Sequence, residues 1–177
     1  MKTNIALIGF MGSGKTAVGQ VLAKKLGWQL IEIDSIIERK TGKSIADIFQ
    51  YDGEIYFREL EIEAIKNIST GSRQVIGCGG GLVLNTINID RLRKTSIIIN
   101  LFASPEIILK RTARNHGSRP LLNVDQPAER IRELLKFRKP FYASAADITI
   151  NTSKMKIDTV ANTIINRLKN YEGFNFQ

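Results

Sequence analysis

Residues 9–16 read GFMGSGKT, and this stretch decides the fold expected for the 177-residue chain. It fits the phosphate-binding loop (P-loop) pattern of Gly, four residues of any kind and then Gly-Lys-Ser/Thr. An apolar run over Asn4–Gly9 precedes it, and a helix-like pattern over Lys15–Leu26 follows it. Chance matches to the motif occur in on the order of one per cent of chains of this length. We therefore predict a strand, a P-loop and a helix.

Each residue type in this loop suits the binding of a nucleotide. Gly12 and Gly14 let backbone N–H groups turn inward, in conformations that a side chain would obstruct. The helix that follows points its positive end at the same anion. Lys15 supplies a charge for the β- and γ-phosphates, and the Thr16 hydroxyl suits direct binding of Mg²⁺. The residues expected to contact the nucleotide are Gly12, Ser13, Gly14, Lys15, Thr16 and Ala17.

Apolar runs alternate with helix-like segments along the chain, which predicts a single α/β domain over residues 1–177 with a mostly parallel sheet. In such sheets ligands bind at the carboxyl ends of the strands. The polar stretch Gly117–Gln126 indicates a loop or short lid. The expected strands are Asn4–Gly9, Gln29–Ile33, Gln74–Gly77, Ser96–Leu101 and Ile148–Ile150, and the expected helices are Lys15–Leu26, Ser44–Phe49, Gly53–Ile68, Glu106–Arg114, Ala128–Ala143 and Ile157–Asn170.

Composition excludes several classes of protein. The chain is 43% hydrophobic and 24% charged with 4 prolines, values that disordered and collagenous proteins do not have. No apolar run reaches the length of a membrane span and no leader-like segment opens the chain. A single cysteine, Cys78, excludes an internal disulfide, and a small buried residue is the better interpretation of it than a reactive thiol. We expect a cytoplasmic protein that does not bind membranes.

The net charge of +9 lies in the second half of the chain. Residues 1–90 hold 10 basic and 10 acidic side chains, whereas residues 91–177 hold 16 and 7. A basic half favours an anionic partner. Nucleic acid is not expected, because no aromatic cluster alternates with the basic residues as a stacking platform requires. A small anion, such as nucleotide phosphates or a carboxylate, explains the charge as well.

Two carboxylates, Glu32 and Asp34, end the second apolar run and are expected beside the P-loop. The Asn-Lys-x-Asp motif of guanine-nucleotide enzymes is absent from the sequence. A P-loop with nearby acids favours a small phosphotransferase, in which the metal and the acceptor both lie near the second strand.

Three further features are expected to form the acceptor pocket. Arg58 and Glu61 lie three residues apart on one helix, so the acid can brace the guanidinium as it clamps a planar anion. The three glycines at 79–81 follow the third strand and indicate close approach of the backbone to a ligand. Arg138 belongs to a helix that is expected to pack back toward the cleft.

Together these motifs resemble the shikimate kinase family over roughly residues 4–152. The resemblance implies that ATP phosphorylates the 3-hydroxyl of shikimate, a step in making aromatic amino acids. It also implies a three-layer P-loop kinase with five parallel strands in the order 2-3-1-4-5 and a short lid. The motifs that resemble the family are GFMGSGKT at 9–16, Asp34, TGKSIADIF at 41–49, Gly53, Glu54, Phe57, Arg58 and Glu61, the glycines at 79–81, RPLL at 119–122, and Arg138 two residues before a proline.

The resemblance also implies roles for individual residues. Asp34 contacts the ring hydroxyls, and Arg58 and Arg138 hold the carboxylate. Arg119 belongs to a lid at about residues 112–126, and the substrate-binding region covers about 34–61. Glu32 stands where the family usually has Asp, and it is expected to hold Mg²⁺ through water. The expected catalytic residues are Lys15, Asp34 and Arg119, and the expected substrate-binding residues are Asp34, Arg58, Glu61, Gly79, Gly80, Gly81 and Arg138.

The residues leave some alternatives open. Another small-molecule kinase of this fold, acting on gluconate or a nucleoside monophosphate, would also use a P-loop, and a non-catalytic ATP-binding module is a further alternative. The two arginines with Asp34 and the three glycines favour shikimate, and the retained Lys15 and Thr16 favour catalysis. Asp34 can orient the attacking hydroxyl, and whether it also accepts the proton is left open. The partners expected are ATP with Mg²⁺ and shikimate, bound by a monomer.

Overall fold

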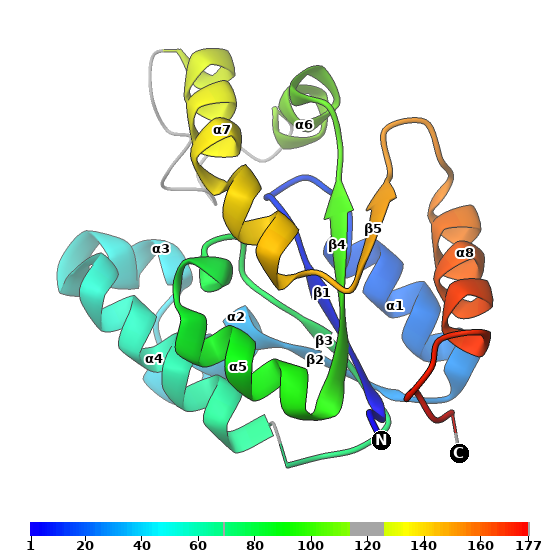
Figure 1. The fold of residues 1–177 in the computed structure, drawn as a ribbon. Coiled ribbons are helices and arrows are strands. Elements are labelled where there is room, and N and C mark those ends of the chain that lie inside the picture. Colours follow the sequence, from blue (N-terminus) through cyan, green and yellow to red (C-terminus); the bar gives the residue numbers. More distant parts are fainter. Residues whose placement is uncertain (69, 114–125, 177) are drawn as a thin grey trace.

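The protein folds as three layers, with a parallel sheet between two layers of helices (Figure 1). This computed structural model describes residues 1–68, 70–113 and 126–176. The strand order is β2-β3-β1-β4-β5, as predicted. All five predicted strands are present, and their ends differ from the expected ones by at most one residue. The strands are β1 (Asn4–Ile8), β2 (Gln29–Glu32), β3 (Gln74–Gly77), β4 (Ser96–Phe102) and β5 (Ile148–Asn151).

The two faces of the sheet are covered by different helices (Figure 1). Because side chains alternate along a strand, β1 sends Ile5 and Leu7 to one face and Ala6 and Ile8 to the other. The first face packs against α1 (Lys15–Leu26) and α8 (Ile157–Lys169). The second packs against α2 (Ile33–Thr41), α4 (Gly53–Ile68), α5 (Thr86–Thr95), α6 (Pro105–Thr112) and α7 (Pro127–Ala145).

Helix α2 corrects the prediction for the end of the second strand. Ile33 and Asp34 were expected to end that strand, but β2 ends at Glu32 and both residues lie in the first turn of the helix. The buried side chains of α2 are Ile33 and Ile37, four residues apart, which is a helical spacing. The continuous apolar character of Gln29–Ile33 masked this helical signal.

The segment expected as one helix over Ser44–Phe49 is a composite. A single turn, α3 (Ile45–Asp47), is capped by Ser44, whose hydroxyl accepts from the Asp47 N–H at 3.1 Å. It continues into a π-helical turn, η1 (Ile48–Asp52), which buries Ile48. Gly53 then adopts a φ of 87°, a left-handed value that suits glycine, and α4 begins there. Single π turns of this kind are often found at functional sites.

Like α2, two further helical elements of the described structure were not predicted. After the glycines at 79–81 the chain forms a 3₁₀ turn, η2 (Leu82–Leu84), and then α5. Asn85 caps α5 by accepting from the Ile87 N–H at 3.0 Å. Both elements are short, and their mixed polar and apolar sequence has no long helical period. Helix α6 begins one residue earlier than expected, and Arg114, the expected end, lies outside the described residues.

Helix α7 runs two residues past its expected end and has Pro140 in its interior. Proline has no N–H for the helical hydrogen bond, and it bends a helix. The ribbon of α7 changes direction part-way along its length (Figure 1). Its last section returns toward the sheet, where Arg138 and Tyr142 are buried.

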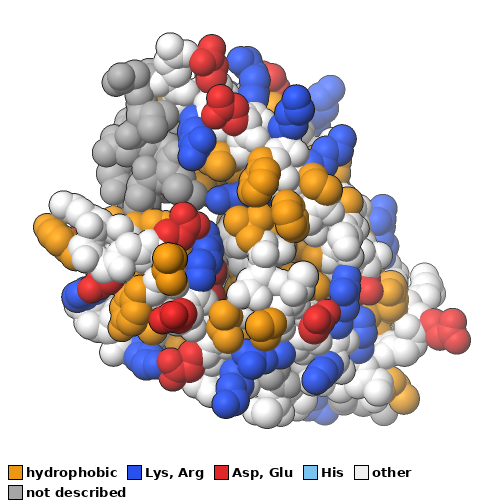
Figure 2. All heavy atoms as spheres, turned by 60° about the vertical axis from the view of Figure 1, so that its left-hand side comes forward, with side chains coloured by type: hydrophobic (Ala, Val, Ile, Leu, Met, Phe, Trp, Pro, Cys, Tyr) orange, Lys and Arg blue, Asp and Glu red, His pale blue; other side chains and the backbone are white. Residues whose placement is uncertain are grey.

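The surface over α4, α5 and α7 mixes charges of both signs with hydrophobic side chains (Figure 2). Exposed apolar residues there include Phe137 and Phe141 of α7, whose ring centroids lie 5.6 Å apart. No helix in the described part of the chain combines the length and apolar character that crossing a membrane requires. The expectation that nucleic acid does not bind stays a prediction.

Candidate active site

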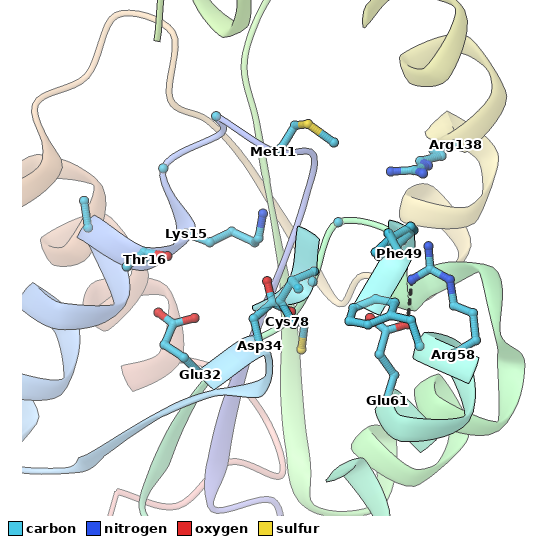
Figure 3. A pocket seen from close by; sticks show the side chains of 18 of the residues that line it. Met11, Lys15, Thr16, Glu32, Asp34, Phe49, Arg58, Glu61, Cys78 and Arg138 are labelled. Atoms are coloured by element: carbon cyan, nitrogen blue, oxygen red, sulfur yellow. Dashed lines mark hydrogen bonds and ion pairs between the residues drawn. The ribbon is translucent and has the colours of Figure 1, made fainter. Parts of the chain in front are cut away.

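A pocket of about 440 Å³ opens at the carboxyl ends of the central strands (Figure 3). One side is the P-loop and the start of α1, and the other is formed by α4, α7 and the glycines at 79–81. Ser13 is fully buried and is not one of the lining residues, so its expected contact with the nucleotide stays a prediction. Arg119 lies outside the described residues. The other predicted site residues all line the pocket: Gly12, Gly14, Lys15, Thr16, Ala17, Glu32, Asp34, Arg58, Glu61, Gly79, Gly80, Gly81 and Arg138.

The P-loop depends on left-handed backbone at its glycines. Gly12 and Gly14 have φ values of 77° and 102°, which side-chain-bearing residues rarely adopt. Gly9 also has room for no side chain, because a Cβ there would collide with the Leu101 carbonyl oxygen of β4. The start of the loop therefore lies close against the end of β4.

Lys15 folds back over the loop from which it comes. Its ammonium donates to the carbonyl oxygens of Gly9 at 2.8 Å and Phe10 at 3.1 Å. The first turn of α1 directs backbone N–H groups to the same place, and a helix N-terminus favours anions. Positive charge is thus concentrated where the motif predicts phosphates.

Glu32 and Asp34 form the acidic part of the pocket and lie near Thr16 and Lys15 (Figure 3). Burial raises the pKa of both carboxyl groups, and the positive charge of Lys15 opposes the rise in each. At Glu32 a hydrogen bond from Thr16 also opposes the rise. These groups therefore need a cation or a proton close by to remain buried.

The oxygen atoms around Thr16 and Glu32 suit Mg²⁺. The Oε1 atom of Glu32 is buried and has no hydrogen-bond partner among the described residues. Gly77, the register partner of Glu32 in β3, leaves room for this side chain, because a Cβ at 77 would collide with the carboxylate. Hydroxyl and carboxylate oxygens are the ligands that Mg²⁺ prefers, with water and phosphate completing its shell. The donor set fits the ion.

Arg58 is held in place by two acids of its own helix. Its Nη1 atom lies 2.6 Å from Glu61 Oε2, the pairing that the sequence predicted, and its Nη2 atom lies 2.7 Å from Glu54 Oε1. Glu61 is fully buried, and burial raises its pKa to about 7 although the charge of Arg58 opposes the rise. The guanidinium is therefore fixed in orientation before any ligand arrives.

Gly79 and Gly81 leave room for neighbouring side chains. A Cβ at Gly79 would lie 2.9 Å from Glu61 Oε1 and 3.2 Å from Asp34 Oδ1, and one at Gly81 would collide with the Arg58 guanidinium. None of the glycines at 79–81 has a left-handed φ. Gly79 and Gly81 give space to charged groups of the pocket, and the expected approach of a ligand to the three glycines stays a prediction.

Arg138 is the second buried cation of the acceptor side, and it differs from Arg58. It is 3% exposed, and its Nε and Nη1 atoms have no hydrogen-bond partner in the part of the chain that the structure describes. Its guanidinium carbon lies 5.8 Å from the centroid of the Phe10 ring. A buried guanidinium with unsatisfied N–H groups favours an anionic ligand.

Several lining residues were given no individual role by sequence reasoning, although Phe49 and Phe57 fall within the region 34–61 expected to bind substrate. Phe49 of η1 and Phe57 of α4 face the pocket with ring centroids 4.8 Å apart. Arg111 of α6 donates to the Thr152 carbonyl at 2.9 Å and the Gly12 carbonyl at 3.2 Å, joining the end of β5 to the P-loop. Arg111 stands in the basic second half, but no motif singles it out. Cys78 lines the pocket as a buried residue whose thiol pKa is raised by burial, as expected for an unreactive side chain.

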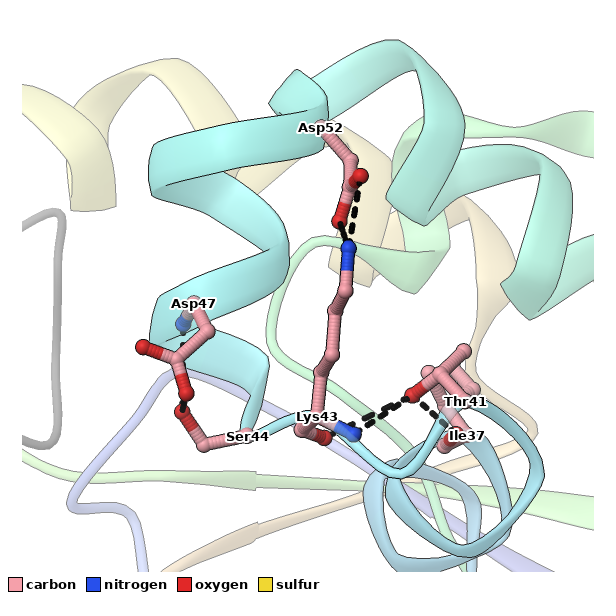
Figure 4. Close-up of polar contacts among 6 residues, drawn as sticks. All are labelled: Ile37, Thr41, Lys43, Ser44, Asp47 and Asp52. Carbon is pink, nitrogen blue, oxygen red and sulfur yellow. Dashed lines mark hydrogen bonds and ion pairs between the residues drawn. The ribbon is translucent and has the colours of Figure 1, made fainter.

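The segment that presents Phe49 is tied down from outside the pocket (Figure 4). Lys43 forms an ion pair with Asp52, its Nζ atom 2.7 Å from Oδ2. The Thr41 hydroxyl donates to the Ile37 carbonyl at 2.9 Å, which closes the end of α2. These contacts connect α2 to the far end of η1 and fix the chain on either side of Phe49.

Comparisons with known proteins show strong similarity to shikimate kinases. The shikimate kinase family model matches residues 11–169. The shikimate kinase of Thermodesulfovibrio yellowstonii is 47% identical over 169 residues, 96% of this chain and 95% of that one. That of Caldanaerobacter subterraneus is 48% identical over 162 residues, 92% and 94% of the two chains. The solved structure of shikimate kinase from Acinetobacter baumannii in complex with shikimate has a TM-score of 0.92 and 36% identity, and the match covers 98% of this chain and 96% of that one.

Proposed function

The chain belongs to the shikimate kinase family, and on that premise we propose which residues hold each reactant. It is a phosphotransferase that uses ATP to phosphorylate the 3-hydroxyl of shikimate, giving shikimate 3-phosphate and ADP. This reaction belongs to the biosynthesis of aromatic amino acids. Phosphoryl transfer asks a protein mainly for positioning and for neutralisation of charge. In this chain, positioning and charge neutralisation fall to the residues that line the pocket.

ATP binds with its phosphates on the P-loop. Gly12, Gly14 and the first turn of α1 supply backbone N–H groups, and the Lys15 ammonium already lies on the same side of the loop. Ala17 lines the pocket next to Thr16. Arg119 is assigned to the lid on the family resemblance alone.

Mg²⁺ is bound by the Thr16 hydroxyl directly and by Glu32 through water. Support comes from the orphaned Glu32 Oε1 atom and from the room that Gly77 leaves for this carboxylate. When bound, the ion neutralises charge on the phosphates of ATP. Glu32 replaces a shorter Asp of the family, and an acid that acts through water tolerates one additional methylene.

Shikimate binds between Asp34 and the two arginines. The observation that supports this is that Arg58 and Arg138 lie on one side of the pocket, with Asp34 on the side of Lys15 (Figure 3). The arginines hold the carboxylate, Asp34 orients the 3-hydroxyl, and the backbone at 79–81 lies against the ring. Glu61 acts through Arg58, which it holds at 2.6 Å.

An acceptor assay tests this arrangement. ADP release is measured with ATP and Mg²⁺ and with shikimate, gluconate, AMP, or a shikimate analogue whose carboxylate is replaced by a hydroxymethyl group. We expect shikimate to be preferred, and the analogue to lose about 100-fold in kcat/KM because the buried guanidinium groups lose their partner. An analogue used as well as shikimate would contradict the assignment of the arginines.

The remaining expectations concern the whole chain. We propose that residues 1–177 form one domain, that the protein is a monomer, and that it acts in the cytoplasm. Size-exclusion chromatography with light scattering at several protein concentrations tests the monomer.

A further inference from the structure

Tyr142 is a buried residue next to the acceptor pocket that has no part in the assignment above. It is 5% exposed and lies on α7, four residues after Arg138. Residues four apart on a helix share a face, so the phenol ring and the guanidinium point the same way. Pro140 lies between them, in the part of the helix that bends back toward the sheet.

The phenol hydroxyl contacts two parts of the pocket. It donates to the Gly80 carbonyl oxygen at 2.6 Å, which joins α7 to the turn after β3. Burial raises the pKa of Tyr142 to about 12, while the charge of Arg138 and a hydrogen bond with it act to lower this pKa. The hydroxyl is therefore protonated at physiological pH and can donate to Gly80 while its oxygen accepts from Arg138.

We propose that Tyr142 is a positioning residue for the acceptor, one that couples the Arg138 guanidinium to the glycine turn at 79–81. The inference rests on the proposed function, in which Arg138 binds the carboxylate of shikimate. Among the described residues Arg138 has no ion pair with an acid, whereas Arg58 has two. Another group must therefore hold the Arg138 guanidinium in place.

Gly80 lies close to both Arg138 and the P-loop, so a hydrogen bond that fixes its carbonyl can affect both. A Cβ at Gly80 would lie 3.7 Å from Arg138 Nη1 and 3.4 Å from the Met11 backbone nitrogen of the P-loop. Gly80 is thus in contact with both sides of the pocket, and its carbonyl is fixed by Tyr142. Losing the hydroxyl leaves the Gly80 carbonyl without this donor and releases one restraint on a long, rotatable side chain.

The test is Tyr142→Phe, which keeps the ring in the core and removes only the hydroxyl. We expect the KM for shikimate to rise about tenfold, with the KM for ATP and kcat within about twofold of wild type. A merely structural role would instead change the melting temperature and both KM values together. A KM for shikimate within about twofold of wild type overturns the inference.

Tyr171→Phe is the matched control. Its hydroxyl donates to Asp147 Oδ1 at 3.3 Å, just before the start of β5, and neither residue lines the pocket or has a proposed role. The same atom is removed, and the KM for shikimate is expected to stay at the wild-type value. An equal rise in both variants overturns the inference, since it would show a general response to losing a phenol.

A double-mutant cycle with Arg138→Ala separates the inference from the function on which it rests. We expect Arg138→Ala alone to raise the KM for shikimate about 100-fold, and Tyr142→Phe to add less than about twofold in that background. If Arg138→Ala leaves the KM unchanged, the proposed role of Arg138 fails, and the inference fails with it. If Arg138→Ala raises the KM but the tenfold effect of Tyr142→Phe persists in its presence, only the coupling is overturned.

Discussion

The two sides of the pocket are built in different ways. The phosphate side comes from one continuous stretch, residues 9–17, and its shape is set mainly by the backbone conformation at the glycines. The acceptor side assembles side chains from α2, α4 and α7 around the glycines at 79–81. A side made from backbone is fixed by its local sequence. A side made from converging side chains depends on packing, so its residues can be replaced one at a time.

The acceptor side itself contains two unlike arginines. Arg58 has two acidic partners on its own helix, whereas Arg138 has two nitrogen atoms without a partner in the described structure. Arg58 keeps its orientation through its bonds to Glu54 and Glu61, and Arg138 depends on Phe10, Gly80 and Tyr142 around it. The acceptor therefore meets one neutralised and one unneutralised cation, which leaves net positive charge for a carboxylate.

Lys15→Ala tests the phosphate side and should have the largest effect. In the proposed function the ammonium neutralises charge that develops on the transferred group, and losing one such group costs about 10³-fold in kcat. Steady-state ADP release measures this loss, and shikimate binding by calorimetry should change little. Lys24→Ala, an exposed lysine of the same helix, is the control. A kcat within about tenfold of wild type for Lys15→Ala would contradict the proposed role.

Arg58→Ala tests the acceptor side and should come next. Removing one partner of a buried, hydrogen-bonded charge pair typically costs about 2–5 kcal/mol, so we expect kcat/KM for shikimate to fall about 100-fold while ATP binding is retained. Lys43→Ala is the matched control, because it removes another acid-paired cation of the same region outside the pocket (Figure 4). If shikimate use by Arg58→Ala stays within about threefold of wild type, Arg58 does not bind the acceptor.

The contrast between a locally encoded phosphate side and a packed acceptor side also explains what the sequence could predict. The P-loop and the five strands were predictable, because the motif and the apolar runs are local signals, whereas the order of the strands was implied only by the family resemblance. The Arg58–Glu61 pair was predictable from helical spacing alone. By contrast, Asp34 was assigned to a strand end, because the apolar run before it continues into the first turn of α2.

Residues missed by sequence reasoning owe their place to packing between distant elements. Phe49 faces the pocket because η1 has π-helical geometry, which no residue pattern announced. Arg111 reaches the P-loop across about a hundred residues of sequence. Tyr142 and Gly80 are 62 residues apart, and their contact requires the bend of α7. Ser13 is buried, and its expected contact with the nucleotide stays a prediction.

Glu32→Gln tests the metal proposal at the border between the two sides, with a smaller effect. The amide keeps the shape of the carboxylate and removes its charge, and outer-shell losses of this kind cost about 10–100-fold in metal affinity or activity. We expect the Mg²⁺ concentration for half-maximal activity to rise about tenfold. Glu32→Asp, which restores the family's usual residue, should titrate like wild type. If the activity of Glu32→Gln shows the same Mg²⁺ dependence as wild type, Glu32 has no role in binding the metal.

The smallest effect is expected for the pH dependence of stability that Glu61 produces. Its carboxyl group has a pKa of about 7 in the folded protein, raised by burial from 4.5. A carboxyl group with a raised pKa holds its proton more tightly in the folded state than in the unfolded state. The stability that this contributes is present below about pH 4.5 and is lost as the pH rises through about 7.

Glu61→Gln removes this titration and keeps the size of the side chain. The melting temperature of wild type minus that of Glu61→Gln should therefore decrease between about pH 5 and pH 8. Glu63→Gln, an exposed position of α4, is the control and should show no such trend. A difference between wild type and Glu61→Gln that stays constant with pH would mean that Glu61 is already ionised at pH 5. In that case the Arg58–Glu61 pair carries fixed charges throughout, and the contrast between the two arginines becomes sharper.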